Sequence, residues 1–373
     1  MQLTGTLTSV VLLALQLHVQ SVVASSGQGF IERSLNLGNL TARGEHLAKG
    51  HHRHHAHHHP ILSKGSTFPA TIRVKQLKTS THSAIWVVPV EAGGSKLNLA
   101  LDAQFTDLVV NPGVYKPSAT AKKGADFKVM RTSEEVAVGK QYGDHVAISG
   151  LSLNEFNFAV AEKKWYEGAD GLLGFAFDWK SEVNGQNVPL PVALQMAGAI
   201  KEATMGLALW SNSPKAGITL GGRDPSKFKG GVQEVEVTQG YPMWSTPGKL
   251  GGVDVTFTLD TQRRIINAPR AVAAAIFKNV GLETFTDKDG FLLGKVDCKA
   301  PKPIYIELGK VKVPIAGISD EKAPDGQCTV PIVGVATPEA IPNGDLVAGA
   351  AFFENLYIEL SWQKGTVGYA ARA

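Results

Sequence analysis

The sequence predicts a mostly-β protein built from two related halves. From about Thr67 onward, short apolar or alternating runs are separated by Gly, Pro or Asp, and the 373 residues include 40 Gly and 19 Pro. This composition suits many short strands joined by tight turns. Helical patterns are few: 191–203 is one, and 268–281, with Gly281 as its C-terminal stop, is another. A phrase that brings a strand to an Asp also occurs twice, once in each half.

Each strand is expected where an apolar or alternating run is bounded by turn residues. The runs that fit are, in order, 84–92, 96–103, 107–112, 145–153, 156–162, 217–222, 232–238, 253–260, 304–315 and 356–362. Strand patterns far outnumber helical ones, which places the chain among mostly-β proteins.

The N-terminal region is expected to lie outside this β fold. Residues 1–24 are an apolar stretch followed by small residues, which indicates a secretory signal cleaved after Ala24. A membrane anchor is the alternative, because no Lys or Arg precedes the stretch. Residues 25–66 are polar and resemble a pro-segment or linker. Their His-rich run, 51–60, is interpreted as a flexible tract with incidental affinity for divalent metals and the capacity to gain charge at about pH 6.

The composition argues against several classes of partner. The formal net charge of +4 is small, and the sequence contains no nucleic-acid-binding motif, P-loop or dinucleotide fingerprint. No segment after the N-terminal stretch is apolar enough to span a bilayer. We therefore expect neither a nucleic acid nor a membrane as partner.

The chain has two cysteines, Cys298 and Cys328, and no neighbouring Cys/His cluster with metal-ligand spacing. In a secreted chain such a pair most simply forms one disulfide. Closing a loop of about 30 residues would stabilise the fold by roughly 3–4 kcal/mol. Two unrelated buried thiols are the alternative.

The repeated Asp phrase is the main functional signal. "LALDAQ" at 99–104 and "FTLDTQ" at 257–262 each deliver an Asp at a strand tip, with Gln two residues later. An apolar pair running into Gly follows each phrase, at 172–174 and at 347–349. This pattern indicates an internal duplication. An isolated Asp at a strand end is usually a turn former, but two in matching contexts indicate a shared role.

With these features the chain resembles pepsin-like aspartic proteases of the secreted fungal type, over roughly residues 67–373. The segments that carry the resemblance are "ADGLLGFAF" at 169–177, "GITLGGRDPSKFKGGVQEVEV" at 217–237, "YPMWSTPGKLGGVDVTFTLDTQ" at 241–262 and "LSWQKGTVGYA" at 360–370. The resemblance implies a mostly-β, bilobal fold with a central cleft and a few short helices. It implies an N-terminal lobe at 67–222, a C-terminal lobe at 223–373 and a second-lobe disulfide at the two cysteines.

The resemblance maps the catalytic carboxylates of the family onto Asp102 and Asp260. In the family, the two carboxyls share one proton across the lobe interface, because two close like charges cannot both ionise cheaply. One then acts as base on a bound water, and the other acts as acid toward the scissile carbonyl. The resemblance therefore implies a monomer that takes a peptide or protein in an interlobe cleft and needs no metal or cofactor.

The segments around both carboxylates depart from the family pattern, which is hydrophobic-Asp-Thr-Gly-Ser/Thr. Residues 102–105 read "DAQF" and residues 260–263 read "DTQR". In the family, two Thr hydroxyls lock the loops together across the interface. Thr261 keeps one of them, but Ala103 cannot supply the other.

Four further residues differ from the pattern. Gln104 and Gln262 replace the Gly that allows close backbone approach. Phe105 and Arg263 stand where the family has a hydroxyl that donates to the Asp. If Arg263 turns toward Asp260, its guanidinium favours the ionised carboxylate and opposes the shared-proton state; the alternative is that it turns outward to a surface acid.

The substrate-covering hairpin of the family is placed at 134–148, where a Tyr-Gly pair is expected. The sequence has Val138 and Gly139 there. Tyr142 would supply the Tyr only after a register slip, and an ordinary hairpin residue is the alternative reading.

Two hypotheses about function follow. Both Asp residues favour a secreted acid endopeptidase, whereas the altered neighbours suggest weak or lost catalysis. The alternative is a non-catalytic pseudoprotease that binds peptides or proteins in the same cleft.

Overall fold

The computed structural model describes residues 69–78, 84–130, 136–177, 188–239, 243–315, 317–319, 322–336 and 345–373. These all belong to the compact unit Pro60–Ala373. The predicted signal at 1–24, the segment 25–66 and the His-rich run lie outside the described residues. Among the described residues, no helix is both long and apolar enough to cross a membrane.

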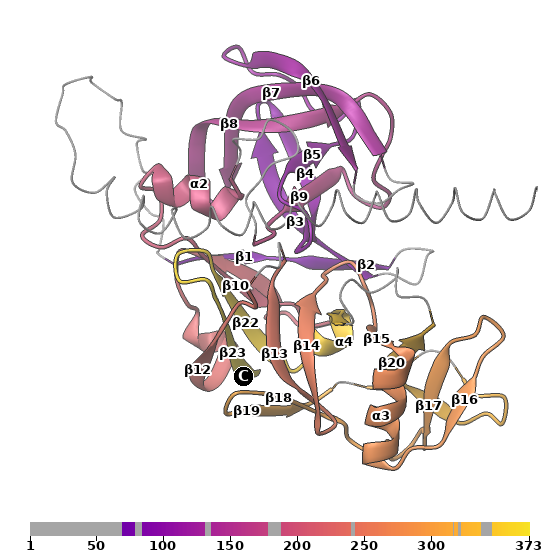
Figure 1. The fold of residues 1–373 in the computed structure, drawn as a ribbon. Helices are drawn as coiled ribbons and strands as arrows, with labels where there is room; N and C mark the ends of the chain where they lie inside the picture. Colours follow the sequence, from indigo (N-terminus) through magenta and orange to yellow (C-terminus); the bar gives the residue numbers. More distant parts are fainter. Residues whose placement is uncertain are drawn as a thin grey trace, which may run out of the picture. The chain divides into compact units, whose positions relative to one another are not determined.

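An eight-stranded sheet forms the N-terminal lobe (Figure 1). Its strands, in spatial order, are β2 (Lys75–Lys78), β3 (Ala84–Ala92), β4 (Ser95–Asp102), β9 (Gly171–Gly174), β5 (Leu108–Val110), β8 (Leu151–Ala161), β7 (Val136–Ile148) and β6 (Lys122–Met130). The run 145–153, expected to be a single strand, is instead the hairpin between β7 and β8, because Ser149 and Gly150 turn the chain with φ of 50° and 82°.

A nine-stranded sheet forms the C-terminal lobe. Its strands, in spatial order, are β16 (Thr284–Thr286), β17 (Leu292–Val296), β20 (Cys328–Val335), β15 (Ile266–Pro269), β21 (Leu346–Ala348), β14 (Val253–Leu259), β13 (Ser245–Leu250), β18 (Tyr305–Leu308) and β19 (Val311–Pro314). With the eight-stranded sheet, it makes the predicted mostly-β, bilobal fold.

A six-stranded sheet draws its strands from distant parts of the chain. They are, in spatial order, β1 (Ala70–Arg73), β11 (Gly217–Leu220), β10 (Thr204–Ala208), β22 (Leu356–Ser361), β23 (Thr366–Arg372) and β12 (Phe228–Glu236). Two Trp side chains donate hydrogen bonds to the segment that follows β9. Trp244 Nε1 donates to the Phe175 carbonyl at 2.7 Å, and Trp362 Nε1 donates to the Ala176 carbonyl at 3.0 Å.

The two lobes repeat one strand arrangement, which confirms the predicted duplication. β4 runs parallel to β9, which is antiparallel to β5, which in turn is parallel to β8. In the second lobe, β14 runs parallel to β21, which is antiparallel to β15, which is parallel to β20. Each Asp of the repeated phrase therefore lies at the C-terminal end of the first strand of an equivalent motif, as the last residue of β4 or the residue after β14.

In the part of the chain that the structure describes, helices are few and short, as expected. They are α2 (Leu190–Met196), η1 (Pro225–Lys227), α3 (Arg270–Val280) and α4 (Ala350–Phe353). α3 confirms the helix predicted at 268–281, and Gly281 ends it with a φ of 67°. α2 ends at Met196 rather than at 203, because Gly198 turns the chain with a φ of 74° and the Ala199 N–H returns to the Leu194 carbonyl.

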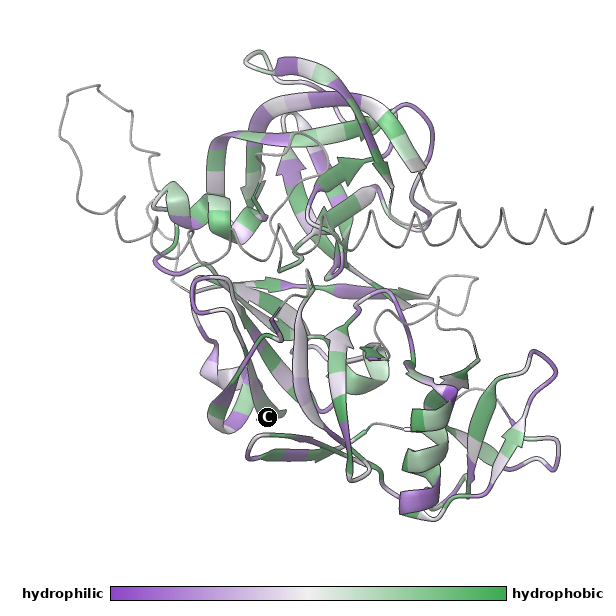
Figure 2. Ribbon diagram, in the orientation of Figure 1, coloured by the Kyte–Doolittle hydropathy of each residue, from purple (hydrophilic) through white to green (hydrophobic). Residues whose placement is uncertain are grey.

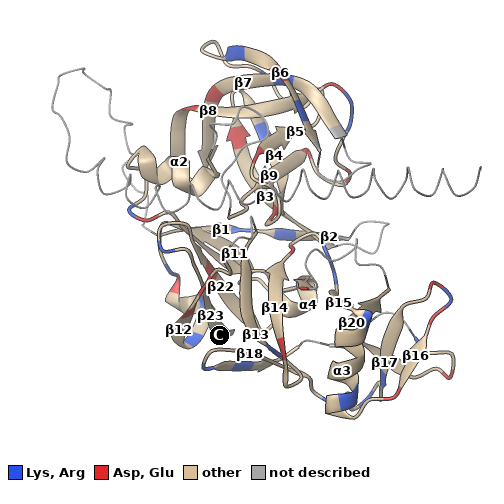
Figure 3. Ribbon diagram, in the orientation of Figure 1, with Lys and Arg blue, Asp and Glu red and all other residues tan. Residues whose placement is uncertain are grey.

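Apolar residues concentrate along the strands (Figure 2). The largest buried cluster includes strand residues of all three sheets, and a second cluster covers the other face of the N-terminal sheet. Figure 3 shows Lys and Arg interspersed with Asp and Glu over both lobes, in keeping with the small net charge.

Candidate functional site

Asp102 is the last residue of β4 and is fully buried. The parallel neighbour β9 places Gly174 opposite it, and the Phe175 N–H donates to the Asp102 carbonyl at 2.9 Å. A Cβ on Gly174 would lie 2.4 Å from the Phe105 carbonyl oxygen, so only Gly fits there. The apolar–apolar–Gly segment thus packs directly against the first Asp segment.

Asp260 follows β14 and is 4% exposed. Its backbone N–H donates to the Ala348 carbonyl of β21 at 3.1 Å. A Cβ on Gly349 would lie 2.3 Å from the Ile265 carbonyl oxygen, so this Gly also allows a close backbone approach. The second Asp segment therefore repeats the local architecture of the first.

Each carboxylate is supported by the backbone of the Gln two residues later. The Gln104 N–H donates to Asp102 Oδ1 at 2.8 Å, and the Gln262 N–H donates to Asp260 Oδ1 at 2.8 Å. A backbone donor is available whatever the side chain. A Gln at the position where the resemblance implies Gly therefore still provides this support in both segments.

Thr261 joins the two segments across the lobe interface. Its Oγ1 accepts the Ala103 N–H at 3.2 Å and donates to the Leu101 carbonyl at 2.7 Å. Ala103 is fully buried and has only a methyl group to offer in return. The structure thus brings the two Asp segments together through the single hydroxyl of Thr261.

Gln262 adds a second connection across the same interface. Its Nε2 donates to the Leu101 carbonyl at 2.5 Å, and its Oε1 accepts the hydroxyl proton of Tyr166. The side chain is therefore engaged at both polar ends, and the residue is 7% exposed.

Phe105 is buried in the second N-terminal cluster, with its ring centroid 5.9 Å from that of Trp165. An aromatic packing contact thus stands at the position where the resemblance implies a hydroxyl. Tyr166 belongs to the same cluster, so this apolar group adjoins the Gln262 contact.

Arg263 turns toward Asp260, and its Nε lies 3.1 Å from Asp260 Oδ2. Asp260 therefore accepts from a backbone N–H at one oxygen and from a guanidinium at the other. A fixed positive charge at this distance favours the ionised carboxylate. The Arg263 side chain remains 45% exposed, so solvent screens part of this interaction.

The residues placed on the covering hairpin lie on β7. Val138 is 42% exposed, whereas a Cβ on Gly139 would lie 2.1 Å from the Val160 carbonyl oxygen. Tyr142 packs against Tyr115 and Phe158, with ring centroids 5.1 and 6.4 Å away. Its ring therefore takes part in the packing of the N-terminal lobe.

Two open hollows lie away from the Asp segments. One, of about 490 Å³, is lined by the β1–β2 segment, by β3 and β4, and by residues 168–170. The other, of about 700 Å³, lies beside α3 and includes Arg270, Lys278 and Leu292 in its lining. Neither includes Asp102 or Asp260.

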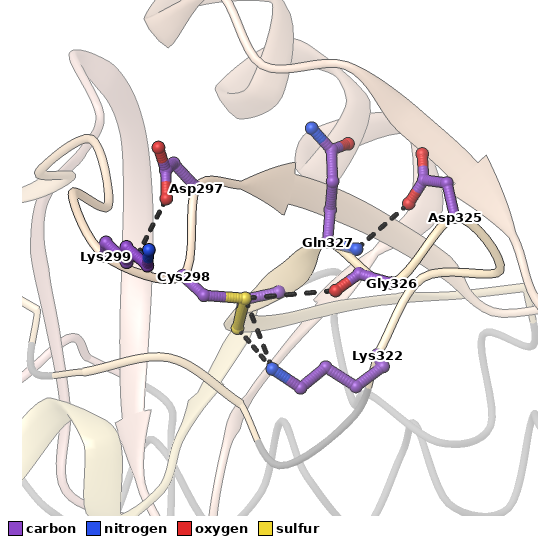
Figure 4. The surroundings of a disulfide bond; sticks show 8 residues. Asp297, Cys298, Lys299, Lys322, Asp325, Gly326 and Gln327 are labelled. Carbon is purple, nitrogen blue, oxygen red and sulfur yellow. Dashed lines mark hydrogen bonds between the residues drawn. A yellow bond between two sulfur atoms is a disulfide. The ribbon is translucent and has the colours of Figure 1, made fainter.

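Cys298 and Cys328 form a disulfide in the C-terminal lobe, which confirms the predicted pairing. Cys328 begins β20 and is fully buried. Lys322 extends over the bond, with its Nζ 3.2 Å from Cys298 Sγ (Figure 4).

Sequence reasoning missed Trp165 and Tyr166. They stand in "KKWYEGADG", immediately before the apolar–apolar–Gly segment of the first half. Their position in the sequence could have identified them. The segment that follows them packs beside Asp102, so residues just before it are expected near the lobe interface.

Comparisons with known proteins agree with this architecture. The family model described as "Eukaryotic aspartyl protease" matches residues 80–372. Secreted aspartyl protease 1 of Malassezia globosa is 27% identical over 77% of this chain and 73% of its own length. Rhizopuspepsin-1 of Rhizopus niveus is 28% identical over 65% of this chain and 64% of its own length. Secreted aspartic protease 5 of Candida albicans is 25% identical over 61% of this chain and 62% of its own length.

A solved structure shows the same fold. The aspartic proteinase from Irpex lacteus superposes with a TM-score of 0.66 and 15% identity, over 82% of this chain and 97% of that one. Two of the relatives above are named as secreted, which confirms the secretion expected from the sequence. Since the family model spans most of its length, the chain belongs to the eukaryotic aspartyl protease family.

Proposed function

We propose that this chain is a secreted, monomeric member of the aspartic peptidase family that binds a peptide or protein between lobes 67–222 and 223–373. Asp102 and Asp260 are its carboxylate pair. Hydrolysis by this pair is weak or lost, and the site needs no metal or cofactor. Names of relatives from three fungi, all of them aspartic proteases or pepsins, support the class of ligand.

The ion pair between Arg263 and Asp260 is the observation that carries the proposal of weak catalysis. Hydrolysis by two carboxyls requires one to keep a proton while the other activates water. A guanidinium beside Asp260 favours its ionised form. It also occupies Oδ2, one of the two oxygens with which this carboxyl could bind water or a substrate carbonyl.

The loss of hydroxyl groups acts in the same direction. A peptidase holds its reacting groups within about half an ångström of the productive geometry, and here Ala103 and Phe105 offer methyl and phenyl groups instead of hydroxyls. If hydrolysis is lost entirely, the alternative function is that of a pseudoprotease, which binds without cleaving. The exposed part of the Arg263 guanidinium next to Asp260 favours it, because it offers a ligand a hydrogen-bonding group and a positive charge.

The test is a cleavage assay on the purified secreted protein. Denatured protein substrates are incubated from about pH 2 to 7, the range in which such a dyad titrates, with and without a statine-type inhibitor. We expect little inhibitor-sensitive cleavage, while calorimetry still detects inhibitor binding. Asp260→Asn controls for contaminating peptidases. Robust cleavage that both the inhibitor and Asp260→Asn abolish would show that catalysis survives.

A further inference from the structure

The two Gln residues of the repeated phrase use their side chains differently. Their backbone N–H groups support Asp102 and Asp260 in the same way, at 2.8 Å. The Gln262 amide is hydrogen-bonded at both ends. Within the described part of the chain, the half-buried Gln104 is hydrogen-bonded through its backbone alone. The two halves therefore differ in the hydrogen bonding of this Gln side chain.

The Gln262 side chain reaches two separate elements of the N-terminal lobe. Nε2 donates to the Leu101 carbonyl near the end of β4, and Oε1 accepts from Tyr166, which precedes β9. The same Leu101 carbonyl also accepts from Thr261 Oγ1 at 2.7 Å. A carbonyl oxygen has two lone pairs and can accept both bonds. One carbonyl therefore anchors two consecutive residues of the opposite lobe.

This double attachment lies where the lock between the lobes is incomplete. By the symmetry of the two halves, a hydroxyl at position 103 would reach the C-terminal segment as Thr261 reaches Leu101. Ala103 has no such group. We propose that Gln262 is a positioning residue that takes over the missing half of the lock from residue 103, with Tyr166 as its support. This proposal rests on the proposed function only in taking Asp260 as one of the carboxylate pair.

The hydrogen bonding of Gln262 argues for a fixed strut instead of a space-filling side chain. A buried amide is costly unless its donor and acceptor are both paired, and here both are paired across the interface. The same residue supports Asp260 Oδ1 through its backbone N–H. Fixing the side chain therefore fixes the donor that orients the carboxylate. Gly at this position would remove both side-chain hydrogen bonds and would also make the backbone more flexible.

The test replaces Gln262 by Met, which keeps the volume and removes both hydrogen bonds. Gln104→Met is the matched control, and Ala103→Thr is added to each. Urea unfolding midpoints measure stability, and calorimetry with a statine-type inhibitor at about pH 4, between the two ionisations of a pepsin-type carboxyl pair, reports on the carboxylate geometry in folded protein. We expect Gln262→Met to lower the midpoint and to weaken inhibitor binding about tenfold, a 1.4 kcal/mol change. We expect Ala103→Thr to recover most of both losses.

Tyr166→Phe keeps the proposal testable should Ala103→Thr fail to fold. If Gln262 and Tyr166 act together, the double variant Gln262→Met/Tyr166→Phe should lower the urea midpoint by less than the sum of the two single effects. Additive losses, or an equal shift from Gln104→Met, would overturn the proposal. If the double-variant losses are not additive but the parent does not bind the inhibitor, the role of Gln262 is supported and the proposed function is contradicted. If the parent binds the inhibitor but the losses are additive, the proposed function is supported and the role of Gln262 is contradicted.

Discussion

Arg263 Nε lies 3.1 Å from Asp260 Oδ2, so the second Asp of the repeated phrase is half of an ion pair. At the equivalent sequence position, three residues after Asp102, the chain has Phe105, whose buried ring packs near Trp165. The carboxylates of the two lobes thus share the same backbone support, and at Asp260 a guanidinium is added to it. This difference affects the proton that a working pair must hold between them.

Removing the guanidinium should raise the pKa of the Asp260 carboxyl, because the ionised form loses a favourable neighbour. The measurement is an NMR titration of this carboxyl in the parent and in Arg263→Thr. Lys278→Thr removes the same charge from the exposed face of α3 and serves as control. An unchanged or lowered pKa in Arg263→Thr would contradict the role given to the ion pair.

Restoring peptidase activity should require several changes together. Two of the altered residues contact the retained parts of the site: Gln262 shares the Leu101 carbonyl with Thr261, and Arg263 pairs with Asp260. Members of such networks act as a unit, so single reversions should do little. Gln262→Gly alone should even be harmful, because it removes the strut before the hydroxyl at position 103 is restored.

The composite variant combines changes at six positions. They are Ala103→Thr, Gln104→Gly, Phe105→Ser, Val138→Tyr, Gln262→Gly and Arg263→Thr. We expect it to cleave denatured substrates in an inhibitor-sensitive way, with a rate well above the product of the single effects. A single reversion that restores the same rate would contradict the idea of a network.

Much of the fold was predictable because a strand delivering an Asp beside an apolar–apolar–Gly segment is a local pattern that occurs twice. Gly281 likewise marked the end of α3 in the sequence. α4 was not predicted, because its four residues, Ala350–Phe353, are too few to show a helical period.

The side-chain contacts of the site were less accessible from the sequence. Tyr166 and Gln262 are 96 residues apart, and nothing local pairs them. The direction of Arg263 was open for the same reason, since an exposed guanidinium pairs with whichever carboxylate the fold brings near. Tyr142 was ambiguous until its packing against Tyr115 was known. Such contacts depend on how the lobes meet, which a linear pattern does not contain.

The disulfide should contribute substantially to the stability of the C-terminal lobe. Cys298 and Cys328 are separated by 30 residues, and the chain-entropy model gives roughly 3–4 kcal/mol for a loop of this size. The double variant Cys298→Ser/Cys328→Ser should lower the free energy of unfolding in urea by about that amount. Thiol titration of the unfolded, unreduced parent should find no free thiol. Two titratable thiols, or an unchanged free energy of unfolding, would contradict the prediction.

Asp144 should make the stability of the N-terminal lobe depend on pH in the acid range. The carboxylate is 2% exposed and accepts hydrogen bonds from the Tyr115 hydroxyl at 2.7 Å, from the Ser118 hydroxyl and N–H, and from the His145 N–H. Burial raises its pKa, but these hydrogen bonds outweigh burial and lower the pKa from 3.8 to about 2. The folded state therefore binds this proton less readily than the unfolded state does.

The sign of the effect follows from this shift. Above about pH 4 both states are ionised and the full contribution is present, on the order of 2 kcal/mol; it is lost as the pH falls through about 2. Asp144→Asn removes this pH-dependent contribution. The difference in free energy of unfolding between the parent and Asp144→Asn should therefore shrink steadily from about pH 4 to about pH 2. Asp289→Asn, in an exposed turn, provides the comparison for a general charge effect. A difference that stays constant over this range would mean that the Asp144 carboxyl titrates alike in the folded and unfolded states, and that its hydrogen bonds do not favour the ionised form.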